Sequence, residues 1–81
     1  MEARKTREHD HRATATAMIV SDMLAAGFSA RANANGNALV SLTRPLMPHE
    51  VEAALESAGY DPCQYQIHRT AGGVEVVAIT G

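Results

Sequence analysis

Two segments of the chain repeat apolar residues at the three- and four-residue spacing of an amphipathic helix. In the first segment, Ile19 and Met23 share one stripe, which predicts a helix over residues 13–26. A charged pair one turn apart, Glu8 and Arg12, would allow this helix to extend further toward the N-terminus.

The second helix is predicted to begin at Pro48, because the fixed φ of proline suits a first helical position. Apolar residues then follow at positions 51, 54, 55 and 58. Both helices end in an Ala-Gly-aromatic sequence, in which Gly27 and Gly59 fit the left-handed residue of a Schellman cap. Such a cap folds the next aromatic residue back onto its helix, here Phe28 onto Met23 and Tyr60 onto Leu55.

Alternation of apolar and polar residues follows each helix and predicts two β-hairpins. In residues 28–34 the even-numbered positions are expected to be buried, and in residues 63–68 the odd-numbered positions, Cys63 included. Asn35-Gly36 and Gly72-Gly73 are the expected two-residue turns, because both central residues of a type I′ turn need positive φ. Residues 38–43 and 74–80 are richer in apolar side chains, so they are expected to form the central strands.

The helix-strand-strand unit occurs twice. Ile19–Phe28 aligns with Val51–Tyr60, and Asn35–Thr43 aligns without gaps with Gly72–Thr80. The fold predicted is α+β: an αββαββ internal duplication with a four-stranded antiparallel sheet and two helices on one face. This order is that of a ferredoxin-like fold whose first strand has moved to the C-terminus, which places the last strand between the second and the third.

The helix ends LAAGF and ESAGY resemble the repeats of SPOR domains, which are peptidoglycan-binding modules of related architecture. The resemblance covers roughly half of the chain and rests on helix-end chemistry followed by a strand. It implies a fold, and we infer no ligand from it.

Composition and charge indicate one domain, residues 13–81, preceded by a flexible charged tail, residues 1–12. A single cysteine excludes an internal disulfide, and no apolar run suits a membrane span or a secretory signal, so a cytoplasmic location is expected. The tail has a net charge of +1 and the remainder −3. A body of that sign repels phosphate backbones, which makes nucleic acid an unlikely partner.

Residues of catalytic type do not combine into a site. Cys63 and His68 are five positions apart on one predicted strand, so their side chains point to opposite faces, and Cys63 is interpreted as a small core residue. Glu52 and Glu56 are interpreted as a charged outer helix face, because nothing nearby would split their pKa values. No catalytic residue is predicted, and the chain is expected not to be an enzyme.

Metal and cofactor sites are also not predicted. His9 and His11 supply only two imidazoles on a tail, which does not close a tetrahedral metal site. Gly72-Gly73 matches neither of the glycine-rich phosphate-binding patterns.

The uncovered face of the sheet is the candidate site. The repeat alignment puts Val40 and Leu42, with their equivalents Val77 and Ile79, in the core. The open face would then carry Leu39, Val74, Val76 and Ala78, flanked by Ser29, Arg31, Asn33, Gln64, Gln66 and His68. From these we predict a partner-binding set: Arg31, Leu39, Gln64, Gln66, His68, Val74 and Val76.

Two alternatives remain for this face. If the last strand has the opposite orientation, Val77 and Ile79 are exposed in place of Val74 and Val76. An apolar strip on an uncovered face is typical of an interaction surface. Alternatively, the N-terminal helix or the loop Arg44–Met47 folds over the strip.

The function predicted is a small non-catalytic interaction module. It would form a homodimer or bind and inhibit another protein through the open face, in the manner of accessory regulators of phages and plasmids. The alternative is a module that binds nucleic acid on the sheet face, which would need exposed aromatic residues and a cationic rim.

Overall fold

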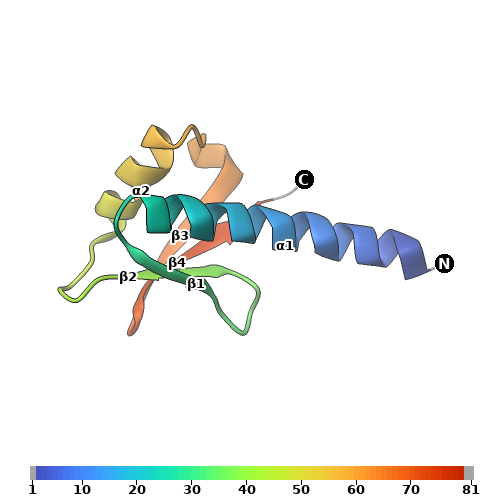
Figure 1. Ribbon diagram of the computed structural model, residues 1–81, viewed down its shortest axis with the longest axis horizontal. Helices are drawn as coiled ribbons and strands as arrows, with labels where there is room; N and C mark the ends of the chain where they lie inside the picture. Colours follow the sequence, from blue (N-terminus) through green and yellow to red (C-terminus); the bar gives the residue numbers. More distant parts are fainter. Residues whose placement is uncertain (1, 80–81) are drawn as a thin grey trace.

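The computed structural model describes residues 2–79, with side chains described from Arg12 onward. The chain is α+β (Figure 1). Its elements are α1 (Glu2–Ala25), β1 (Ser29–Ala32), β2 (Ala38–Ser41), α2 (Pro48–Ser57), the short 3₁₀-helix η1 (Pro62–Gln64), β3 (Tyr65–Thr70) and β4 (Gly73–Ala78).

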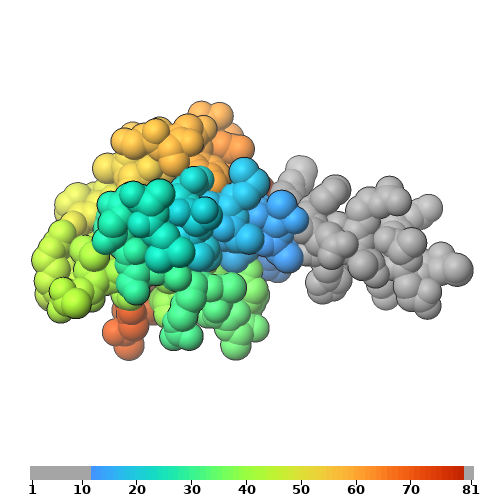
Figure 2. Space-filling view, viewed as in Figure 1, coloured from blue at the N-terminus to red at the C-terminus, as the bar shows by residue number. Residues whose placement is uncertain are grey.

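The four strands form one antiparallel sheet in the order β1-β2-β4-β3. The last strand therefore lies between the second and the third, as the sequence predicts. Both helices cover the same face of this sheet, with α1 crossing it lengthwise and α2 beside it (Figure 1). In the space-filling view of this side, the tip of the β3–β4 hairpin (red) and the β1–β2 hairpin (green) project below the helices (Figure 2).

The core lies between the two helices and the sheet. The helices contribute Ile19, Met23, Val51 and Leu55, and the sheet contributes Ala38, Val40, Tyr65, Val74, Val76 and Ala78. Leu46, from the loop between β2 and α2, is also buried in this cluster. That loop consequently runs on the helix side and does not cover the opposite face.

The helix ends are the Schellman caps that the sequence predicts. The Phe28 amide donates to the Met23 carbonyl, and the Tyr60 amide donates to the Leu55 carbonyl, each at 3.0 Å. Gly27 and Gly59 have φ values of 99° and 98°, the left-handed conformation that this cap requires.

The first turn differs from the prediction. The Gly36 amide donates to the Asn33 carbonyl, and the Asn33 amide donates to the Asn37 carbonyl, which closes a three-residue loop. Within the described residues positive φ occurs only at glycines, so Asn35 is not in the conformation that a type I′ turn needs. The hairpin is a type I turn followed by Gly36 at φ 79°, a common three-residue form.

The second turn is displaced by one residue from the prediction. Thr70 pairs with Gly73, so the loop consists of Ala71 and Gly72 and not of Gly72 and Gly73. This shift leaves the faces of β4 unchanged, because Val74 lies on the side of the odd-numbered β3 residues with either turn. The faces differ from the repeat alignment because the first hairpin has a three-residue loop and the second a two-residue loop. Val74 and Val76 are fully buried in the core, and the alternative orientation considered above is the one observed.

Three further expectations are wrong in part. Cys63 is exposed in η1 and is not a core residue. Ala32 is predicted to be buried like Ala30, but it is exposed, and β1 ends there. The first helix begins at Glu2 and not near residue 13. The mobility of residues 1–12 stays a prediction.

Candidate partner-binding surface

The open face of the sheet carries a row of four side chains, one from each strand. The register places Arg31 of β1 beside Leu39 of β2, Leu39 beside Glu75 of β4, and Glu75 beside His68 of β3. Arg31 and His68 are exposed at the two edges, while Leu39 and Glu75 are half-buried between them. None of the described helices packs on this row, so a partner could contact all four residues.

Apolar side chains form a strip that shares Leu39 with this row. We call Leu39, Val77 and Ile79 the open-face strip. Val77 is half-buried and Ile79 is 45% exposed. The Ile79 amide donates to the Gln64 carbonyl at 2.9 Å, which continues the pairing of β3 and β4 past the end of β4. Val77 and Ile79 therefore point to the same face.

Of the seven residues predicted to bind a partner, four lie on the open face and three do not. Arg31, Gln66 and His68 are exposed on the open face, and Leu39 is half-buried there. Val74 and Val76 are in the core and cannot contact a partner in the folded chain. Gln64 lies outside the sheet, in η1, where its side-chain oxygen accepts a 2.7 Å hydrogen bond from the Asp61 amide.

Glu75 is fixed in place by asparagines from the first hairpin. Its Oε2 atom accepts hydrogen bonds from Asn33 Nδ2 and Asn37 Nδ2, each at 2.8 Å. These bonds, that from Asn33 foremost, favour the ionised carboxylate and lower the pKa of Glu75 below its ordinary value. The charge of Glu75 at the middle of the open face is thus held in one position.

Helix α1 is tied to the same hairpin. Arg12 Nη2 donates to Asn37 Oδ1 at 2.7 Å, and Thr16 Oγ1 donates to the Gly36 carbonyl at 2.8 Å. Asn37 is buried and thereby connects α1 on one side of the sheet to Glu75 on the other. Among the described residues no buried side-chain polar atom lacks a hydrogen-bond partner, and the buried Asn37 side chain is satisfied by these bonds.

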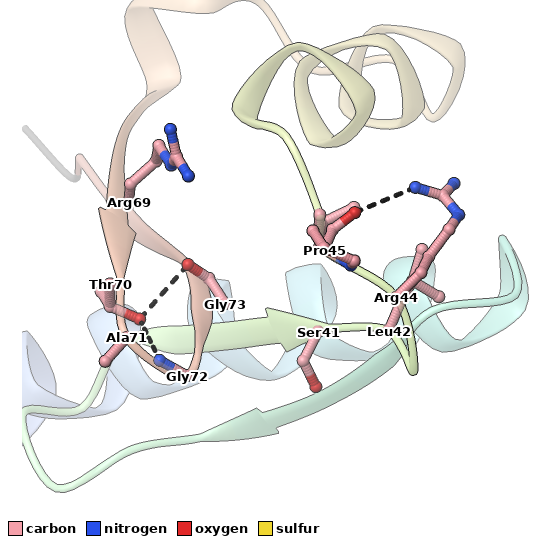
Figure 3. A pocket seen from close by; sticks show the side chains of 10 residues that line it. Ser41, Leu42, Arg44, Pro45, Arg69, Thr70, Ala71, Gly72 and Gly73 are labelled. Carbon is pink, nitrogen blue, oxygen red and sulfur yellow. Dashed lines mark hydrogen bonds between the residues drawn. The ribbon is translucent and has the colours of Figure 1, made fainter.

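A separate pocket of about 290 Å³ lies at the end of the sheet, between the loop after β2 and the β3–β4 turn (Figure 3). Arg44 and Arg69 are its cationic side chains. Arg44 is engaged, since its Nη1 and Nη2 atoms donate to the two carboxylate oxygens of Glu50 at 3.1 and 2.6 Å. Arg69 comes from β3 and points away from the turn (Figure 3).

Neither a cluster of metal ligands nor a membrane-spanning helix is found among the described residues. Within residues 12–79 no three His, Cys, Asp or Glu side chains are grouped as metal ligands. The side chains of His9 and His11 lie outside the part of the chain for which side chains are described. No helix of residues 2–79 is long and apolar enough to cross a bilayer.

Comparisons of the chain with protein-family models, with curated proteins and with solved structures give no significant match. The surface must therefore be interpreted from its own geometry, and the resemblance of the helix ends to SPOR repeats is not extended to a ligand.

Sequence reasoning missed Glu75 as the centre of the open face. The signal was present in the segment Val74–Ala78, where a single acid interrupts an otherwise apolar strand. An ionised side chain is rarely buried without a partner, so Glu75 points outward and Val74 and Val76 point inward. That argument from one residue outweighs the ungapped repeat alignment.

Proposed function

We propose that the chain is a small non-catalytic interaction module, which binds a protein through the open face of its sheet. The observation that carries the proposal is the open-face strip, Leu39, Val77 and Ile79, next to the polar row from Arg31 to His68. Apolar residues rimmed by polar groups on a face without a covering helix are typical of interaction surfaces. The partner is another protein, such as one that the chain inhibits, or a second copy.

The character of the face favours a protein over nucleic acid. All three aromatic residues of the chain are engaged elsewhere: Tyr65 is buried, Phe28 packs against the core, and Tyr60 is hydrogen-bonded to Asp22. Stacking platforms for bases are thus missing from the open face. Arg31 and Glu75 offset each other there, whereas phosphate binding needs an excess of positive charge.

The proposal is tested by a pair of charged variants. Val77→Lys places an ammonium in the middle of the open-face strip, while Ala17→Lys places the same charge on an exposed position of α1. A binding protein recovered with the wild-type chain and with Ala17→Lys should be lost with Val77→Lys. Equal recovery with both variants would place the binding surface elsewhere.

We also propose that the fold is a permuted ferredoxin-like arrangement produced by internal duplication. The strand order and the two matching Schellman caps support this origin. The facing of β4 requires the second half of the alignment to shift by one residue, so that Val74 and Val76 match Ala38 and Val40. A cytoplasmic location belongs to the same proposal, since the only cysteine, Cys63, is exposed and unpaired.

A further inference from the structure

Within residues 2–79 no strand lies beside the outer edge of β3, which is the last strand in the sheet order. The Ile79 amide donates to the Gln64 carbonyl, and antiparallel pairs alternate between hydrogen-bonded and non-hydrogen-bonded. Gln66, His68 and Thr70 therefore direct their N–H and C=O groups toward β4. The corresponding groups of Tyr65, Ile67 and Arg69 point away from the sheet.

This edge lacks most of the features that protect edge strands from pairing. The strand is six residues long, contains no proline, and pairs with β4 in a continuous register without a bulge. The opposite edge strand, β1, has only four residues. The β3 edge is therefore the better template for an added strand.

The strand that best fits this edge is β3 of a second copy of the chain, because both its register and its charges match. In a symmetric antiparallel pair centred on Ile67, Ile67 meets its own equivalent and Tyr65 meets Arg69 of the second copy. Tyr65, Ile67 and Arg69, whose backbone N–H and C=O groups point away from the sheet, then all lie in hydrogen-bonded pairs between the two copies. A pair centred on Tyr65 or on the position of Gln66 leaves Arg69 beyond the paired strand, and a pair centred on Arg69 opposes two guanidinium groups.

The pair centred on Ile67 also joins opposite charges. Tyr65 and Arg69 point to the helix side of the sheet, because they share the orientation of Ile67. Helix α2, which carries Glu52 and Glu56, packs against β3, and the charges of these two residues add to burial in raising the pKa of Tyr65. Arg69 of the second copy, opposite Tyr65, would lie beside the same helix, and Arg69 forms no ion pair within the described part of its own chain.

We propose that two copies of this chain dimerise through the outer edges of β3, antiparallel and centred on Ile67, with Arg69 of each copy near Glu52 and Glu56 of the other. The two four-stranded sheets become one continuous sheet, and the two open faces become one larger face. The inference goes beyond the proposed function, since it rests on the edge of the sheet and not on its open face.

A charge exchange measured by sedimentation velocity tests the dimer. The wild-type chain is expected near twice its mass of 8.6 kDa. Arg69→Glu and Glu52→Arg should each raise the dimer Kd by about tenfold or more, because each places like charges opposite each other at two symmetric positions. The double variant Arg69→Glu/Glu52→Arg should restore the dimer. A wild-type monomer at all concentrations, or an Arg69→Glu variant that dimerises with the wild-type Kd, would overturn the proposal.

Two further variants separate the edge from the open face. Gln66 and His68 of opposite copies face each other in the proposed pair, so Gln66→Cys/His68→Cys in a Cys63→Ser background should form a covalent dimer on oxidation. Absence of that product would contradict the register. If Arg31→Glu abolishes the dimer while Arg69→Glu does not, self-association occurs through the open face: the edge pairing is then wrong and the proposed function survives.

Discussion

Gly73 lies against the carbonyl oxygen of Val40, on the neighbouring central strand of the sheet. Val40 itself pairs with Val74, so this contact lies at the first step of the register between β2 and β4. Gly73 has a φ of 141°, which L side chains rarely adopt. Glycine is therefore required at position 73 for two reasons: the positive φ, and the lack of space for a Cβ atom.

We expect Gly73→Ala to destabilise the domain by about 2 kcal/mol or more, since a Cβ atom would collide with backbone and would also be strained at this φ. Gly72→Ala is the matched control. A Cβ atom at Gly72 meets only the Leu39 side chain at 3.9 Å, an ordinary contact, so this variant should change stability by less than about 0.5 kcal/mol. Urea unfolding of both variants measures the difference, and equal midpoints would refute the observed turn.

The helix layer gives a second prediction. Tyr60 Oη donates a 2.7 Å hydrogen bond to Asp22 Oδ2, which joins the end of α2 to α1. Burial and this bond raise the pKa of Tyr60 to about 12. Tyr60→Phe should lower the free energy of unfolding by about 1–2 kcal/mol, the contribution of a hydrogen bond to a charged group at a partly exposed site. Thermal unfolding at neutral pH checks this value, and an unchanged Tm would show that the bond does not form.

Acid should weaken the start of α2. The Arg44 guanidinium, followed by the Met47 amide, lowers the pKa of Glu50 from 4.5 to about 2. Because the folded-state pKa lies below the unfolded value, the contribution of Glu50 is complete above pH 4.5 and is lost as the pH falls toward 2.

Glu50→Gln should therefore be less stable than the wild type at neutral pH, and the two urea midpoints should converge on acidification. Arg44→Gln is the matched variant, because it removes the other half of the same ion pair and should converge with the wild type in the same way. If the wild type and Glu50→Gln differ equally at every pH, the Arg44–Glu50 pair does not contribute to stability.

Local signals in the sequence predicted most of the fold. The Ala-Gly-aromatic segments gave the correct helix ends, because a Schellman cap depends on a few adjacent residues. Strand order also followed from short connections and the apolar content of the two central strands.

The facing of β4 could not be predicted from the same signals. Asn35-Gly36 and Gly72-Gly73 both suit a two-residue turn, yet the first hairpin has a three-residue loop and the second a two-residue loop. Residues that the ungapped alignment makes equivalent after the turns therefore lie on opposite faces. The alignment thus exchanged Val74 and Val76 with Val77 and Ile79 in the candidate site.

The central claim is that Val76 and Val77 lie on opposite faces of the sheet, so that only the face of Val77 is open to a partner. Its most direct test compares Val76→Lys and Val77→Lys by circular dichroism and thermal unfolding. Val76 is fully buried, so a lysine there must lose the hydration of its ammonium group, and the chain should unfold. Val77→Lys should stay folded, because its ammonium remains in water. Unfolding of Val77→Lys, or a folded Val76→Lys, would contradict the account.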